Sequence, residues 1–265
     1  MNSSDSLEDN IINASDLSNI AISKGVKMLC FPENALLMPS SKHNLLSQSF
    51  SENQNPGLKF FTNLAKKNNI WVLVGSLSIK VSKDKVVNRS YLIDNYGKII
   101  GTYDKIHLFD VTLSNGVSYR ESDRYSPGQH GSVIKTPLAN FGLTICYDVR
   151  FPNLYRKIAL RGANIIFVPS AFTKFTGQMH WSVLLRARAI ETGSYIIAPA
   201  QTGKHHGGRE TYGHSMVVAP DGKVMIDGGE EPGIITCVID IDKVHEARET
   251  IPSLFLNPVY SIEVK

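Results

Sequence analysis

Short apolar runs that alternate with amphipathic segments constrain the fold of this 265-residue chain more than any other feature. Four of these runs are VKMLCF, IWVLVGSLSI, ANIIFVPS and SYIIAPAQ, which begin at Val26, Ile70, Ala163 and Ser194. All are much shorter than the roughly 20 apolar residues that cross a membrane as a helix. Gly, Pro or polar residues interrupt or bound them, which is typical of buried β-strands. The pattern therefore predicts a sheet-based core.

Helical patterns separate these runs. Apolar residues recur near helical spacing after the Ser/Asp-rich start, and the pattern ends at Gly25. A second helix is expected to begin near Pro56, and a third spans HWSVLLRARAIET and ends at Gly193. Turns near 95–97 and 221–222 predict antiparallel hairpins, and GIITCVIDID, from Gly233, is expected to add a strand. The sequence predicts an α/β fold of sheets covered by helices, in one domain over residues 1–265.

Composition excludes several classes of protein. The net charge is +4 and the basic residues are scattered, so no stripe is present that would hold a nucleic-acid backbone. The polar, acidic start lacks the basic and apolar regions of a secretory signal, which favours a cytoplasmic protein without a membrane partner. The three cysteines are widely spaced and form no CxxC motif, so we expect reduced thiols rather than disulfides or a cysteine-rich zinc site.

Cys146 differs from the other two cysteines in its local sequence. Cys30 and Cys237 lie inside apolar runs, where a thiol fills the core. Cys146 lies where an apolar run ends and the polar, Pro-marked helix around 152–162 begins. The carboxyl end of a strand is where α/β folds place their catalytic and binding residues. The N-terminus of the following helix lowers the pKa of a thiol and stabilises an oxyanion. The local context alone leaves two readings of Cys146 open, a nucleophile and a packing residue.

A nucleophilic thiol needs a partner that accepts its proton. Glu33, after LCFP, and Lys105, in GTYDKIHLFD, lie at comparable strand ends. Each taken alone is better explained as a solvated surface residue. Their combination with Cys146 favours a shared site.

FPEN with Glu33, YDKIHLFD with Lys105 and CYDVRFP with Cys146, in this order, resemble the nitrilase superfamily of carbon-nitrogen hydrolases. YSPG, GANIIFVPSAF and YGHSMVVAPDG extend the resemblance over nearly the whole chain, with the branch of deaminated-glutathione amidase and omega-amidase the most similar. The resemblance implies a four-layer α-β-β-α sandwich, a Glu-Lys-Cys triad, no cofactor, and a homodimer or larger homo-oligomer. It also implies a supporting role for Glu121 beside the lysine.

The resemblance implies that Cys146 attacks an amide carbonyl while Glu33 moves the protons, and that Lys105 and the Tyr147 N–H stabilise the oxyanion. A thioester is then hydrolysed. Arg150, four residues after the cysteine, is expected to bind a substrate carboxylate, with pairing to Asp148 as the alternative. The expected function is hydrolysis of a small acidic amide such as deaminated glutathione. Alternatives are an omega-amidase acting on alpha-ketoglutaramate, an N-carbamoyl-amide hydrolase, a nitrilase, and an inactive scaffold.

Two further expectations concern metals and the amino end. The histidines form no H-x-x-x-H pair with a nearby acid, so no metal site is predicted. Members of the superfamily open with an apolar strand, whereas this chain opens with the polar MNSSDSLEDN. We therefore expect the opening strand to be missing, which would leave an open apolar edge beside the Cys30 strand.

Overall fold

Two β-sheets packed face to face form the centre of the molecule. The computed structural model describes residues 1–114, 116–256 and 258–264. The first sheet has the order β1-β2-β3-β4 and consists of β1 (Met28–Cys30), β2 (Trp71–Lys80), β3 (Val86–Ile93) and β4 (Ile99–Asp104). β1 and β2 run parallel, and the remaining neighbours are antiparallel.

The second sheet has the order β14-β13-β10-β9-β8-β7. Its central strands β8, β9 and β10 are parallel to one another, while β7, β13 and β14 pair antiparallel at its two sides. The six strands are β7 (Ser132–Lys135), β8 (Asn140–Leu143), β9 (Ile165–Phe167), β10 (Tyr195–Ala198), β13 (Met216–Val218) and β14 (Val224–Asp227).

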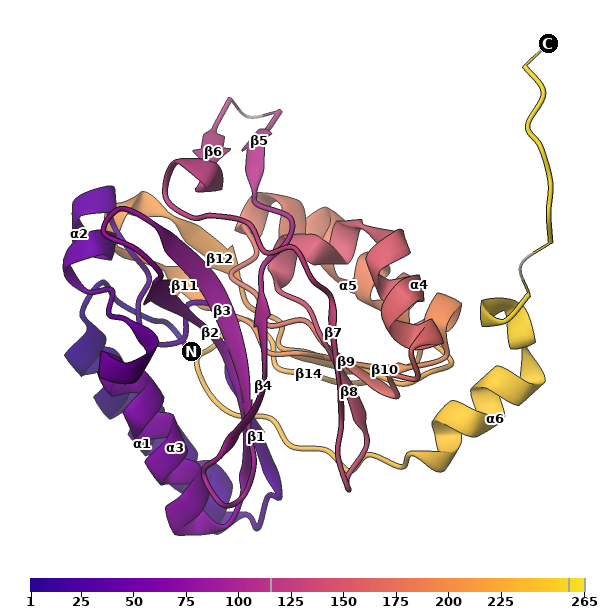
Figure 1. Cartoon of the computed structure of the whole chain (residues 1–265), viewed down its shortest axis with the longest axis horizontal. Helices are drawn as coiled ribbons and strands as arrows, with labels where there is room; N and C mark the ends of the chain where they lie inside the picture. Colours follow the sequence, from indigo (N-terminus) through magenta and orange to yellow (C-terminus); the bar gives the residue numbers. More distant parts are fainter. Residues whose placement is uncertain (115, 257, 265) are drawn as a thin grey trace.

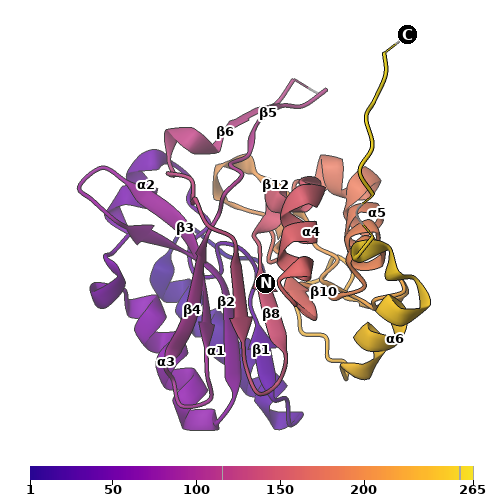
Figure 2. The same cartoon turned by 45° about the vertical axis from the view of Figure 1, so that its right-hand side comes forward.

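Helices cover the outer face of each sheet (Figures 1 and 2). α1 (Leu7–Ser23) and α3 (Pro56–Asn68) lie on the first sheet, and α4 (Pro152–Leu160) and α5 (Lys174–Thr192) lie on the second. The expected four-layer α-β-β-α arrangement is therefore confirmed. The smaller elements are α2 (Lys42–Ser47), α6 (Asp242–Thr250), the ribbon of β5 (Asp110–Thr112) and β6 (Ser118–Arg120), and the ribbon of β11 (Thr202–Lys204) and β12 (Glu210–Tyr212).

The period-two alternation of β2 explains how the layers pack. Val72 and Val74 face the helices with Phe61 of α3, whereas Leu73 faces the second sheet and joins a core cluster that includes Phe141 of β8. All five side chains are buried. Both faces of β2 thus lie against apolar layers, which accounts for its nearly continuous apolar sequence.

Local signals fix the helix ends. The Ser6 side chain accepts a hydrogen bond from the Asp9 N–H at 3.3 Å, and α1 stops before Gly25, whose φ is +74°. The Asn55 side chain likewise caps α3 ahead of Pro56. α5 begins at Lys174, earlier than its apolar pattern indicated.

One strand prediction is wrong. Residues 233–241 form no strand, although their sequence is rich in β-branched residues. β14, the preceding element, pairs with β13 at one edge of the second sheet, and no strand in the described part of the chain lies beside 233–241. A strand pattern without a partner edge does not produce a ladder.

The β1 edge of the first sheet has no strand paired to it within the described residues. β1 pairs with β2 and with no other strand among the residues that the structure describes. This is the edge beside the Cys30 strand that was expected to be open. No helix of the described ranges is long and apolar enough to cross a membrane.

Candidate active site

The carboxyl ends of strands from both sheets meet at the candidate site. Glu33 follows β1, Lys105 directly follows β4, and Cys146 follows β8. Together with Glu121 and Tyr147 they line one cavity of about 480 Å³. The structure thus brings together five of the six predicted site residues from positions far apart in the sequence.

Glu33 is almost completely buried, with 2% of its surface exposed, yet its carboxylate is fully hydrogen-bonded. One oxygen accepts from Lys105 Nζ at 2.8 Å and from Asn88 Nδ2 at 3.0 Å. The other accepts the backbone N–H of Ala171 at 2.8 Å. These three donors fix the position of the carboxylate and stabilise its charged form.

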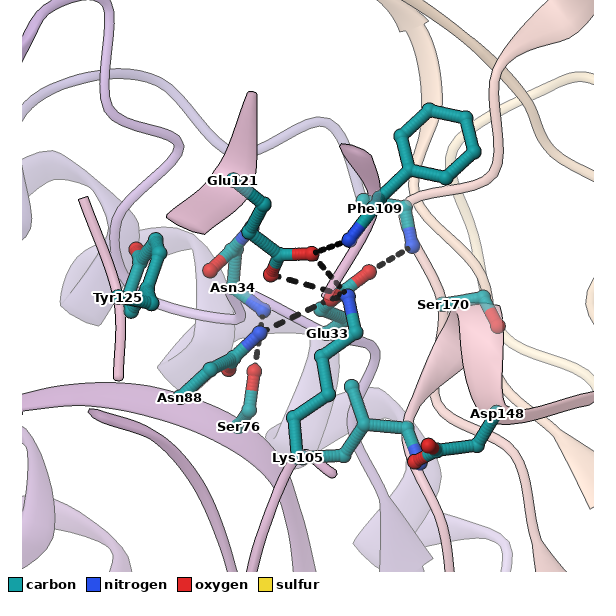
Figure 3. Close-up of polar contacts among 12 residues, drawn as sticks. Glu33, Asn34, Ser76, Asn88, Lys105, Phe109, Glu121, Tyr125, Asp148 and Ser170 are labelled. Atoms are coloured by element: carbon teal, nitrogen blue, oxygen red, sulfur yellow. Dashed lines mark hydrogen bonds and ion pairs between the residues drawn. The ribbon is translucent and has the colours of Figure 1, made fainter. Parts of the chain in front are cut away.

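Lys105 lies between two carboxylates (Figure 3). Besides Glu33, its Nζ donates to both oxygens of Glu121, at 3.0 and 2.9 Å. The Phe109 N–H, at 2.6 Å, holds Glu121 in turn. The ammonium is 2% exposed, so its charge is compensated by these neighbours rather than by water.

The backbone turns sharply at Cys146. Its φ is +48°, in the left-handed region that non-glycine residues seldom adopt, and its N–H donates to the Pro169 carbonyl at 2.9 Å. The short helix Cys146–Arg150 begins there. This turn places the buried thiol at the end of β8, at the cavity wall.

Asp148 holds the turn in place. Its fully buried carboxylate accepts the Ile145 N–H at 2.9 Å, the Tyr103 hydroxyl at 2.7 Å and the His107 N–H at 3.1 Å, with the His107 ring 2.7 Å away. It therefore links the β8 end to the segment that carries Lys105. These contacts, and not an ion pair with Arg150, occupy this acid.

Burial and charge set the protonation states. Burial raises the pKa of the Cys146 thiol, and the negative charge of Glu33 raises it further. Burial alone would raise the pKa of Glu33, but Lys105 and Arg209 outweigh burial and leave that pKa below its ordinary value. Burial disfavours the Lys105 charge, but Glu121 and Glu33 hold its pKa well above the usual range. The resting site thus holds a thiol at Cys146, a carboxylate at Glu33 and an ammonium at Lys105.

The remaining two predicted residues differ in position. Tyr147 lines the cavity, and its N–H lies in the first helical turn, where the helix supplies no acceptor. Arg150 is not among the lining residues. Its guanidinium packs over the Phe172 ring, 5.1 Å from the centroid, and its Nη1 lies 3.3 Å from His180. Arg150 thus contacts the cavity wall and not the cavity.

Two groups of the site, Asn88 and the Ala171 N–H, lacked a clear sequence signal. Asn88 is a buried polar residue of β3 that stands beside Arg89 and Ser90 in the same strand, so its sequence context carried no hint of its role. The Ala171 N–H carries no side-chain signal at all. Arg209, from the Gly-rich loop, lines the cavity, and its buried Nε has no hydrogen-bond partner within the described chain.

No group of three His, Cys, Asp or Glu side chains in the described ranges is arranged to hold a metal ion.

Comparison with known proteins assigns the chain to a family. The family model for carbon-nitrogen hydrolase matches residues 1–249. This chain belongs to the carbon-nitrogen hydrolase family. The hydrolase is 37% identical over 262 residues to a deaminated glutathione amidase of Synechocystis, with 96% of this chain and 94% of that protein covered.

Solved structures agree with this assignment. The NitFhit protein of C. elegans superposes with a TM-score of 0.90 at 35% identity, over 97% of this hydrolase, which spans only 63% of that longer chain. Nit3 of Saccharomyces cerevisiae, a member of the nitrilase superfamily, gives 0.85 at 30% identity over 95% of this hydrolase and 91% of Nit3. The protein is therefore a nitrilase-superfamily amidase.

Asp148 generates a prediction about stability. Replacing it with Asn removes the charge and turns one acceptor into a donor, which then faces a backbone N–H in either orientation of the amide, that of Ile145 or that of His107. We expect Asp148→Asn to lower the free energy of unfolding by about 3 kcal/mol or more. The exposed turn residue Asp221 provides the control, and Asp221→Asn should change the free energy of unfolding by less than about 1 kcal/mol. Urea unfolding measures both, and equal losses would contradict the anchoring role of Asp148.

Proposed function

We propose that this amidase hydrolyses a small acidic amide through a thioester on Cys146. The observation that carries the proposal is the shared cavity in which Glu33 and Lys105 form a buried ion pair beside the thiol. The buried pair supplies both a proton acceptor and a positive charge without contact with bulk water. Such an arrangement suits acyl transfer.

In the first half of the reaction, Cys146 Sγ forms a bond to the amide carbonyl carbon while Glu33 takes the thiol proton. The carbonyl oxygen becomes an oxyanion, which Lys105 Nζ and the Tyr147 N–H stabilise. Glu33 then donates its proton to the departing amine or ammonia as the C–N bond breaks. An acyl thioester remains on Cys146.

In the second half, Glu33 takes a proton from water, and the resulting hydroxide adds to the thioester carbonyl. The same donors stabilise the second oxyanion. The C–S bond breaks, the thiolate recovers the proton from Glu33, and the acid product leaves. Glu121 keeps the Lys105 ammonium in place during both halves, since it holds Nζ with two hydrogen bonds.

The same geometry predicts the effect of substitutions. Cys146→Ala should abolish turnover, and Glu33→Gln and Lys105→Ala should each reduce kcat by roughly a thousandfold, because each removes a group that no neighbour replaces. Cys30→Ala and Cys237→Ala serve as controls and should keep near-normal activity. Release of amine or ammonia is the measurement. Near-normal kcat in Glu33→Gln or Lys105→Ala would show that the roles are misassigned.

The protonation states predict the pH profile. The depressed pKa of Glu33 keeps it ionised at all pH values above its ordinary pKa of about 4.3. The raised pKa of Cys146 means that thiolate does not accumulate near pH 8. We therefore expect kcat/KM to be flat from about pH 6 to 8.5 and to fall only as acid protonates Glu33.

Glu33→Gln is the matched control for the pH profile. The Glu33→Gln enzyme has no internal base, so its residual rate should rise with pH. In this variant the Cys146 thiolate must form by loss of a proton to solvent. A wild-type rate that itself rises about tenfold per pH unit between pH 7 and 8 would contradict proton transfer to Glu33.

Arg209 and Arg150 are the two candidates for binding a substrate carboxylate. Arg209 lines the cavity with an unpartnered Nε, and its charge acts on both Glu33 and Cys146. Arg150 acts instead through the Phe172 wall. We propose that Arg209 makes the direct contact and that Arg150 positions the wall.

The substrate panel tests this assignment. Deaminated glutathione should be hydrolysed faster than alpha-ketoglutaramate, and both much faster than neutral nitriles or N-carbamoyl amines. Arg209→Lys should raise KM for the acidic amides by about tenfold, and Arg150→Lys by less, because lysine lacks the two-pronged fork of arginine. A neutral nitrile as the best substrate, or an unchanged KM in both variants, would refute the carboxylate preference.

We also propose that two copies associate through α5. Phe175, Met179 and Val183 recur every four residues and are 37%, 53% and 66% exposed, which gives one apolar stripe on this helix. Light scattering should report twice the 29.3 kDa chain mass for the wild type and a monomer for Val183→Glu. The control is Ile12→Glu, which changes an exposed side chain of α1, and this variant should remain dimeric. A monomeric wild type at micromolar concentration would contradict the proposal.

A further inference from the structure

One buried hydrogen-bond acceptor of the catalytic cavity takes no part in the steps of acyl transfer. Asn34 follows Glu33 in the chain, lines the cavity and is 6% exposed (Figure 3). Its side-chain oxygen Oδ1 is buried and accepts no hydrogen bond from the described residues. Buried polar atoms are nearly always hydrogen-bonded in folded proteins, because an unpaired one has lost its water without gaining a partner. A donor that the described chain does not supply would complete this position.

The backbone turn at Asn34 does not by itself require this side chain. Its φ is +55°, in the left-handed region that glycine adopts most easily and asparagine tolerates. The Asn34 N–H donates to the Ser76 hydroxyl at 2.8 Å, and the Asn34 carbonyl accepts from Gln201 Nε2 at 3.3 Å. A glycine would allow the same turn without burying a side-chain oxygen. The turn therefore does not account for the carboxamide.

Two other carboxamide oxygens are buried without a partner in the described ranges. They belong to Asn44 on α2 and Asn88 on β3. Neither residue lines the cavity, whereas Asn34 does. Asn34 is thus the one of the three that a substrate in the cavity can reach.

The cavity wall leaves one donor and one acceptor open. The Tyr125 and Thr173 hydroxyls of the wall each bond to a neighbouring hydroxyl, at 2.8 and 2.7 Å. Among the described lining residues, the buried side-chain nitrogens and oxygens without a partner are Arg209 Nε and Asn34 Oδ1. An acidic amide carries the complementary pair, a carboxylate for Arg209 and an N–H for Asn34.

The scissile nitrogen must lie close to Glu33, because Glu33 gives it a proton as the C–N bond breaks. An amide nitrogen also carries one or two N–H groups, which lose their water when the substrate enters the cavity. A fixed acceptor beside the base would pair with one N–H. It would also turn the nitrogen lone pair of the tetrahedral intermediate toward the Glu33 proton.

We propose that Asn34 Oδ1 accepts the N–H of the scissile amide and so selects amides over esters of the same acid. The proposal rests on the hydrolysis of an acidic amide through Cys146. An ester has an oxygen in place of the N–H, so it leaves the buried Asn34 oxygen unpaired. A site built to hydrogen-bond one group of its substrate rejects an analogue that lacks this group. Asn34 is thus a specificity-determining residue at the leaving group.

The test compares Asn34→Gly with the wild type on alpha-ketoglutaramate and on the methyl ester of the same acid at the same carboxyl group. Glycine removes the acceptor but keeps the left-handed backbone. We expect kcat/KM for the amide to fall about tenfold or more, and kcat/KM for the ester to change less than about threefold. Asn69→Gly is the matched control, since Asn69 has a φ of +53° at the end of α3, and it should change neither value.

Binding to Cys146→Ala enzyme provides a measurement that needs no turnover. Adding Asn34→Gly to this variant should weaken amide binding about fivefold in calorimetry and leave ester binding unchanged. Equal losses for amide and ester, or no loss for either, would overturn the role of Asn34. Retained turnover in Cys146→Ala would instead refute the thioester mechanism, which distinguishes the two failures.

Discussion

The buried charge cluster around Lys105 is the interaction on which the candidate site depends. One ammonium, 2% exposed, is held by two carboxylates, and the closest contact is 2.8 Å. Charges buried this deeply are stable only when every partner is in place, because removing one partner leaves an uncompensated charge out of water. The cluster therefore demands that Glu33, Lys105 and Glu121 keep their relative positions.

That demand explains why the site lies between the two sheets. Glu33 and Lys105 come from the first sheet, while Cys146 and the Ala171 N–H come from the second. Asp148 ties the two sides together through Ile145 and Tyr103. No single element contains the cavity, so its geometry depends on the apolar layer that packs the sheets against each other. Loosening that layer would separate the thiol from its proposed base.

Several parts of the structure could be predicted from the sequence, because local rules determine them. Capping at Ser6, the stop at Gly25 and the alternation in β2 depend on neighbouring residues. The motifs around Glu33, Lys105 and Cys146 also predicted that these residues share a site. Asn88, the Ala171 N–H and the Arg209 approach depend instead on long-range packing, which leaves no pattern in one sequence. The failed strand at 233–241 shows the same limit, because a strand sequence forms a ladder only beside an available edge.

The central claim, that acyl transfer passes through Cys146, is most directly tested by trapping the intermediate. Wild-type enzyme mixed with an acidic amide is quenched in acid within milliseconds, and the protein is analysed by intact mass and peptide mapping. We predict a mass increase equal to the acyl group, located on the peptide that contains Cys146 and lost when the mixture is left to turn over. An acyl group on another residue would contradict the account. A burst of product without any acyl-enzyme detected by mass would also contradict it.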